Sequence, residues 1–311
     1  MFEKVNPSHP DKIADRIAGA IVDLAYTLEE NPKIAVEVLI GHGSCHVIIE
    51  SSVDIQLHDI KKIVKRISGV TNTLTIRVKQ DEYLANNQLG EVKCGDNGIF
   101  KGTTTSKYEK LLTNIAGDIY NRYPYDGKYI LRTHNNGAAF ETIICQSHLP
   151  KNNEIEIINL LQNDHRIGFN IINPLGEWTG GIDVDSGATN RKLGSDMGEA
   201  VTGGGLHGKD LSKADVSINI FTYLLMNYHN LPITLNDQFK KIHNHFTNLI
   251  FNKGEIQVSC AIGDTEINFE GYKVPYKIIV ETAREYIKLI GGFEKFAEWG
   301  LLRPNQLYIQ K

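Results

Sequence analysis

The chain has 311 residues, a net charge of −4 and 41% hydrophobic residues, which is ordinary for a globular protein with two or three compact units. This charge argues against nucleic acid as a general partner, because basic residues do not dominate the chain. The four cysteines form no Cys-x-x-Cys pair, so we expect reduced thiols and no zinc site. The N-terminus lacks the apolar core of a signal peptide, and no apolar run reaches the roughly 18 residues that cross a bilayer. We therefore expect a cytoplasmic protein.

Helical and strand-like patterns alternate along the chain. Apolar residues at helical spacing predict helices over 11–30, 54–68, 107–123, 154–162, 215–228 and 275–290. Alternating and β-branched runs predict strands over 33–40, 44–53, 73–79, 128–132, 138–146, 167–172 and 255–262. Asn136-Gly137 predicts a hairpin turn between two of these strands.

This order of helices and strands divides the chain into three stretches of similar composition. We expect an α+β fold of three similar units, each a sheet with helices, in a pseudo-threefold arrangement. The expected units are residues 1–93, 94–174 and 175–311. The third contains the most unusual stretch of the chain.

That stretch runs from Gly180 to Asp215 and combines nine glycines with six acids and four basic residues, namely Arg191, Lys192, Lys209 and Lys213. Glycines let backbone N–H groups turn toward an anion, cations neutralise a polyphosphate, and carboxylates can hold its Mg²⁺. A turn-rich surface loop would show a similar composition. Gly203-x₄-Gly208-Lys209 nearly fits a P-loop, but Asp210 stands where that motif needs Ser or Thr. We predict a phosphate site of another kind.

A second group of polar residues lies at the start of the first expected helix. Ser8-His9-Pro10-Asp11-Lys12 places an imidazole, a carboxylate and an amine at a helix N-terminus, which favours anions. His9 could donate a proton-bearing nitrogen to a leaving oxygen, although a simple helix cap would give the same pattern. Glu37 and Glu50 interrupt expected strands; such carboxylates usually face solvent, yet each could face a site.

Six motifs occur in order between His9 and Gly263: HPDKIAD, GDNG, DxGxTxRK, GGG, GKDxSKxD and EIQVSxAIG. Together they resemble the S-adenosylmethionine synthetase (methionine adenosyltransferase) family. The first and fifth are the specific ones, whereas three glycines alone would mean little. Because the motifs span most of the chain, the resemblance indicates a divergent and shortened member.

The resemblance implies synthesis of S-adenosylmethionine from ATP and L-methionine, followed by hydrolysis of triphosphate to pyrophosphate and phosphate. It also implies Mg²⁺ and K⁺ as cofactors, and a homodimer with active sites between the subunits. Position by position, it implies catalytic roles for His9, Lys209 and Arg191. Contacts with ATP and its phosphates are implied for His9, Asp185, Arg191, Lys192, Lys209, Lys213 and Trp178.

The methionine and metal sites are implied in the same way. The resemblance implies contacts with methionine for Glu50, Gln80, Asp96, Asp185 and Lys213. The Mg²⁺ ligands are Asp11 and Asp215, and the K⁺ ligand is Glu37.

The implied chemistry suits these residue types. A thioether sulfur carries no proton, so its attack on C5′ of ATP needs no general base. The barrier lies in the negative charge that develops on the departing triphosphate. Preorganised Lys, Arg, His and Mg²⁺ stabilise that charge, and one such donor is typically worth about 3–4 kcal/mol.

The chain also departs from the family pattern. The family's GEGH is here Asn6-Pro7-Ser8-His9. Its LRPDAK, aligned with LRTHNN, ends in Asn136 instead of a catalytic lysine, although Lys128 or Arg132 could supply that charge. Its NPTGRF is here NPLGEW, with Glu177 in place of an arginine. We expect a slow synthetase; a triphosphate or nucleotide hydrolase and a non-catalytic ATP-binding pseudoenzyme subunit are the alternatives.

Overall fold

The structure is a computed structural model, and it describes residues 1–30, 32–79, 98–103, 106–134, 139–197, 214–231, 234–253, 255–260 and 266–304. These residues form a mixed helix and sheet fold, which confirms the expected α+β class. None of the described helices combines the length and the apolar character that crossing a lipid bilayer demands.

Three four-stranded sheets organise the described chain. The first, in the order β4-β3-β2-β9, contains β2 (Ile34–Gly41), β3 (Ser44–Ser51), β4 (Asn72–Lys79) and β9 (Ser186–Ala188). The second, in the order β1-β6-β7-β8, contains β1 (Phe2–Val5), β6 (Gly127–His134), β7 (Ala139–Gln146) and β8 (Phe169–Ile172). The third, in the order β12-β11-β10-β5, contains β5 (Gly98–Thr103), β10 (Glu255–Cys260), β11 (Glu266–Phe269) and β12 (Tyr272–Pro275).

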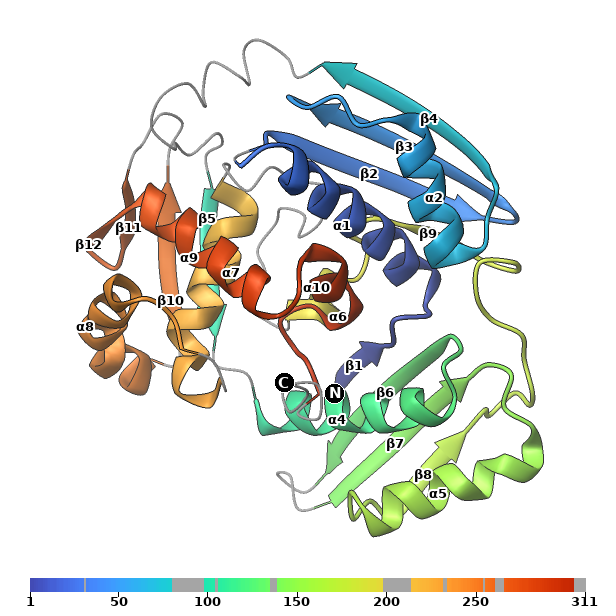
Figure 1. The fold of residues 1–311 in the computed structure, drawn as a ribbon. Coiled ribbons are helices and arrows are strands. Elements are labelled where there is room, and N and C mark those ends of the chain that lie inside the picture. Colours follow the sequence, from blue (N-terminus) through green and yellow to red (C-terminus); the bar gives the residue numbers. More distant parts are fainter. Residues whose placement is uncertain are drawn as a thin grey trace.

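The helices lie between and beside these sheets (Figure 1). They are α1 (Pro10–Leu28), α2 (Leu57–Ser68), α4 (Lys107–Arg122), α5 (Glu154–Asn163), α6 (Leu193–Met197), α7 (Ala214–Asn227), α8 (Asp237–Lys253), α9 (Tyr276–Leu289) and α10 (Phe293–Trp299). Short 3₁₀ helices cover Lys151–Asn153 and Tyr228–Asn230. One core joins the helices α1, α7, α9 and α10 to the first and third sheets, and a second core lies between α4, α5 and the second sheet.

The three sheets do not follow the three contiguous ranges expected from the sequence. Strand β1 pairs with β6, β9 pairs with β2, and β5 pairs with β10. Each of these pairings joins strands from two different expected ranges. The pseudo-threefold relation between units stays a prediction.

Helix α1 begins where the sequence predicts. The side chain of His9 caps it, Pro10 occupies its first turn, and Asp11 places a carboxylate near the positive end of the helix dipole. The sequence predicted one apolar face, but the charged residues Asp11, Lys12 and Asp15 are buried as well. Charges of this kind are buried only when they are paired, so α1 carries more than a packing stripe.

Candidate active site

Strand β9 crosses directly over the first turn of α1. A side chain at Gly187 would lie 2.0 Å from the carbonyl oxygen of Pro10, so only glycine allows this approach. The N–H of Ala188 donates to Oδ1 of Asp11 at 2.9 Å, and the N–H of Asn190 donates to Oδ1 of Asp15 at 2.9 Å. The segment after β9 is thereby held against the N-terminal half of α1.

This arrangement brings two predicted cations to the predicted metal ligand. Nη1 of Arg191 lies 3.5 Å from Oδ1 of Asp11, and Nζ of Lys192 lies 3.4 Å from Oδ2. Nδ1 of His9 lies 3.8 Å from Oδ2 of the same carboxylate. We call His9, Asp11, Arg191 and Lys192 the α1 cluster; the structure brings together four residues that the motifs implied for the phosphate and metal sites.

His9 is buried, and burial lowers its pKa to about 4. Asp11 raises this pKa, whereas the ammonium groups of Lys192 and Lys128 lower it. The imidazole is therefore neutral at pH 7. Its Nδ1 accepts the N–H of Asp11 at 3.2 Å, so the proton of the neutral ring lies on Nε2. His9 is therefore a neutral N–H donor in the free protein.

Two further groups act on the cluster: Asp126, which was not predicted as a site residue, and Lys128, which was considered only as a substitute for the family's catalytic lysine. Asp126 is buried, its Oδ2 accepts the N–H of Gly181 at 3.2 Å, and its Oδ1 has no partner among the described residues. Burial raises the pKa of Asp126, and Lys128 lowers it. The ammonium of Lys128 lies 5.6 Å from the centre of the Trp178 ring. The sequence signal was an acid two residues before a cation, in Asp126-Gly127-Lys128. The sequence alone did not show that Asp126 is buried.

Trp178 borders an apolar cavity of about 340 Å³ next to Lys128. Its Nε1 donates to Oδ1 of Asn173 at 3.2 Å, which fixes the plane of the ring. Leu175 and Cys145 line the same cavity. Glu177 points elsewhere, because its Oε1 accepts the N–H of Lys151 at 2.8 Å. This departure from the family pattern therefore adds no negative charge to the cavity.

The remaining predicted residues fall in three groups. Asp185 is exposed and accepts the N–H of Ser186 at 2.7 Å, and its charge acts on His9. Helix α7 contains Asp215, but the structure describes only its backbone there. Outside the described residues lie Gln80, Asp96, Asn136, Lys209 and Lys213.

Glu37 and Glu50 do not contact the described side chains of the α1 cluster. They share the face of the first sheet opposite to the buried side chains Val36, Val38 and Val47. An oxygen of Glu37 accepts the hydroxyl hydrogen of Thr189. Helix α1 packs on the buried face, so the predicted methionine residue Glu50 and the α1 cluster lie on opposite faces of one sheet.

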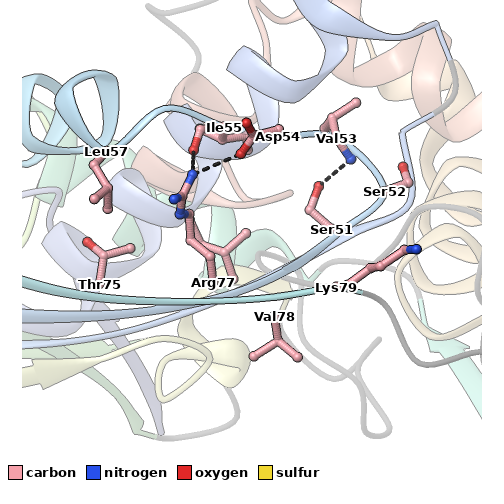
Figure 2. Close-up of a pocket in the computed structure, with 11 residues that line it drawn as sticks. Ser51, Ser52, Val53, Asp54, Ile55, Leu57, Thr75, Arg77, Val78 and Lys79 are labelled. Atoms are coloured by element: carbon pink, nitrogen blue, oxygen red, sulfur yellow. Dashed lines mark hydrogen bonds and ion pairs between the residues drawn. The ribbon is translucent and has the colours of Figure 1, made fainter.

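A larger cavity of about 590 Å³ lies at the other end of this sheet (Figure 2). There Nη1 of Arg77 donates to Asp54 at 2.9 Å and to the carbonyl of Ile55 at 2.8 Å. Ser51 and Lys79 border this cavity, whereas β9 pairs with Leu39–Gly41 at the opposite end of β2. None of the described residues that line it was predicted for the site.

No described group of three or more His, Cys, Asp or Glu side chains is arranged to hold a metal ion. Asp11 is nevertheless a buried carboxylate, and its Oδ2 lies 3.4 Å from Nζ of Lys192 and 3.8 Å from Nδ1 of His9. Hard divalent cations prefer such oxygen donors. Asp11 therefore fits one ligand of a magnesium site, with others required from elsewhere.

Comparisons with known proteins agree with one another. Residues 1–88 match the family description "S-adenosylmethionine synthetase, N-terminal domain". An S-adenosylmethionine synthase of Mycoplasma capricolum is 29% identical over 334 aligned residues, covering 90% of this chain and 79% of the relative. One from Helicobacter pylori is 27% identical, covering 69% of each chain. The solved structure of an unusual S-adenosylmethionine synthetase from Campylobacter jejuni has the same fold, with a TM-score of 0.68, 16% identity, and coverage of 97% of this chain and 94% of that one.

Proposed function

Because the chain is a divergent member of the S-adenosylmethionine synthetase family, we propose that it forms S-adenosylmethionine from ATP and L-methionine. The observation that carries the proposal is the α1 cluster. It places two cations and a neutral N–H donor around a buried carboxylate at the N-terminus of a 19-residue helix. Such a site suits a triphosphate better than it suits a neutral ligand.

The triphosphate would lie over the α1 cluster. Arg191 and Lys192 would exchange part of their attraction to Asp11 for the phosphate oxygens, and Nε2–H of His9 would donate to the oxygen that leaves C5′. Lys209 and Lys213 would add further positive charge. Mg²⁺, held by Asp11 with Asp215, would neutralise the triphosphate when bound. K⁺ would take the Glu37 carboxylate as an oxygen ligand.

The base of the nucleotide would enter the cavity next to Trp178. This cavity is apolar, and an indole ring held by Asn173 presents a flat face to stack on a purine. Its wall includes Lys128, so base and triphosphate would bind side by side. Asp185 would contact both the nucleotide and methionine.

Lys128 supplies the charge that the aligned Asn136 lacks. Lys128 lies opposite Val5 in the pairing of β6 with β1, and Val5 leads within four residues to His9. Residues 135–138 lie outside the described residues, and β6 ends at His134, about 20 Å further along the strand from Lys128 at 3.3 Å per residue. We propose Lys128, not one of residues 135–138, as the cation at the leaving group.

Methionine would be held by Glu50, Gln80, Asp96 and Lys213. Since Glu50 and the α1 cluster lie on opposite faces of the first sheet, one chain cannot bring them together. A homodimer in which the exposed sheet face of one protomer meets the site of its partner would do so. That face carries Leu39, Ile48, Leu74, Ile76 and Val78, each between 44% and 54% exposed, and contiguous apolar side chains of this kind mark interfaces.

The test is to incubate the purified protein with ATP, methionine, Mg²⁺ and K⁺ and to identify the products by mass. We expect S-adenosylmethionine, pyrophosphate and phosphate. Glu50→Ala should raise the methionine requirement far more than the ATP requirement. Phosphate without S-adenosylmethionine would instead indicate a hydrolase, and bound ATP without any product would indicate a pseudoenzyme subunit.

A further inference from the structure

Helix α1 presents a row of buried charges to the segment 188–196. Asp11 and Asp15 lie one helical turn apart, and they accept the N–H groups of Ala188 and Asn190, which lie two residues apart. The two carboxylates thus accept hydrogen bonds from alternate residues of the segment 188–190. Arg191 and Lys192 follow immediately.

Lys12 lies between the two carboxylates in sequence and is fully buried. Its Nζ lies 3.4 Å from Oδ2 of Asp15 and donates to Oδ2 of Asp196, which is 184 residues away in helix α6. The side chains of Lys12, Asp15 and Asp196 are each at most 2% exposed. The ammonium therefore ties both ends of the segment 190–196 to α1.

The far side of the same segment is held as well. Nζ of Lys4 donates to the carbonyl of Ser195 at 2.6 Å. The carbonyl of Asp196 accepts the N–H groups of Leu301 and Leu302 at 2.8 and 3.1 Å. Helix α6 is thus fixed between α1, β1 and the C-terminal turn, and its position does not depend on Arg191 or Lys192.

Arg191 in particular needs such support, because its side chain is 57% exposed, whereas that of Lys192 is 27% exposed. Asn190 before them has φ +68°, a left-handed conformation that is less favourable for asparagine than for glycine and is stabilised by constraints from the surroundings. The bond from its N–H to Asp15 is one such constraint. Cations aimed at a developing charge are effective only when they are already in place.

We propose that Lys12, Asp15 and Asp196 form a positioning triad that fixes the Asn190–Lys192 turn over Asp11, so that its two cations are preorganised for a polyphosphate. This inference rests on the proposed function of the α1 cluster. None of the three residues touches the substrate. They act through the backbone that carries Arg191 and Lys192.

A role of the triad in packing alone predicts a different relation between stability and ligand affinity. Buried ion pairs can often be replaced by apolar residues of similar volume without loss of stability. If the triad only fills the core, stability and ligand affinity should change together or not at all. If it positions the turn, affinity should fall where stability does not.

The experiment measures binding of inorganic tripolyphosphate with Mg²⁺ by calorimetry, together with thermal stability and the KM for ATP. Asp15→Ala should weaken tripolyphosphate binding and raise this KM by about tenfold or more, the equivalent of one or more lost hydrogen bonds. Asp15→Asn, which keeps an acceptor for the Asn190 N–H, should recover most of the affinity. If Asp15→Ala does not fold, the paired change Lys12→Met with Asp196→Leu tests the same point.

Asp23→Ala is the matched control. Asp23 lies at the other end of α1 and also accepts two backbone N–H groups, from Phe293 and Glu294 at 2.7 and 2.9 Å. This variant should lose stability but bind tripolyphosphate as the wild type does. Wild-type affinity in a folded triad variant, or equal losses in Asp15→Ala and Asp23→Ala, would overturn the inference. Unchanged affinity after Arg191→Ala with Lys192→Ala would instead refute the proposed function itself.

Discussion

Single residues in this protein take their protonation states from burial. Burial, with the charge of Asp196 adding to it, raises the pKa of Asp15 to about 7, against the lowering effects of Lys12 and the Asn190 N–H. Burial acts in the opposite direction on His9, whose pKa falls to about 4. Both groups are therefore neutral over part of the range where their free side chains would be charged.

Asp15 should make the stability of the protein fall as the pH rises. The folded protein holds the Asp15 proton up to about pH 7, whereas the unfolded chain releases it near 3.8. This contribution is complete below pH 3.8 and is lost as the pH rises through 7, and it amounts to something on the order of 4 kcal/mol. Asp15→Asn cannot titrate, so its free energy of unfolding should lose less between these pH values than the wild type's.

Urea denaturation at several pH values checks this expectation. His9 and the other groups titrate in both proteins, so the difference between the two stability curves isolates Asp15. Parallel curves would mean that Asp15 is ionised in the folded protein at acidic pH.

At the scale of elements, most long periodic segments were predictable from the sequence, although the 17-residue helix α8 was not predicted. Of the shortest strands, β8 was predicted, whereas β1 and β9 were not. Helix α1 and strands β2, β3, β4 and β7 lie within three residues of their predicted bounds. Strands β1 and β9 are four and three residues long. Such lengths carry no periodicity, and long-range pairing decides their conformation. Helix α10 begins only because Asp23 accepts two of its N–H groups.

The site was predictable only as far as motifs fix residue types. The sequence indicated His9, Asp11, Arg191 and Lys192, and the structure brings them together. It could not show that Asp126 is buried beside Lys128, because that depends on the packing of Gly180 and Trp178 around it. Nor could it show that β6 pairs Lys128 with Val5 of β1.

The direction of β6 leads to a prediction about the missing family lysine. Lys128 and Arg132 lie on the same face of this strand, both exposed, two pleat repeats apart. Lys128→Met should lower kcat by about 10²-fold or more, the typical cost of losing one preorganised donor at a leaving group. Arg132, which pairs with Glu141 at 3.5 Å, is the matched control, and Arg132→Met should have little effect.

Steady-state kinetics with saturating ATP and methionine measure both variants. Equal activity of Lys128→Met and the wild type would remove Lys128 from the leaving-group site. In that case Asn136→Lys becomes the informative variant, because an increase in turnover would place the hairpin in the site after all.

In the whole molecule, the α1 cluster and the proposed methionine residue Glu50 lie on opposite faces of the first sheet. The exposed face is a grid of three rows, in which Leu39, His46 and Leu74 form the first row. Glu37, Ile48 and Ile76 form the second row, and Ala35, Glu50 and Val78 form the third. Apolar side chains surround the two carboxylates, which is the composition of an interface with a few polar groups aimed at a ligand.

We predict that Ile48→Glu yields a folded monomer that makes no S-adenosylmethionine. A carboxylate at Ile48 would stand beside Glu37 at the centre of the grid, where desolvation and like charge both oppose association. Phe169→Glu is the control, because Phe169 is 60% exposed but lies on β8 in the second sheet. Sedimentation velocity at micromolar protein should show dimers for the wild type and Phe169→Glu, and monomers for Ile48→Glu.

Mixing two inactive variants tests whether each site draws on both subunits. If Glu50 of one protomer completes the α1 cluster of the other, Glu50→Ala and Lys192→Ala are each nearly inactive alone at a methionine concentration well below the raised requirement of Glu50→Ala. A heterodimer of the two then has one site with both changes and one site with neither. After exchange of subunits, half of the dimers are mixed and each has one intact site, so about a quarter of the wild-type activity should return. Sites built within a single chain would give no recovery at all, since every protomer in the mixture carries a damaging change.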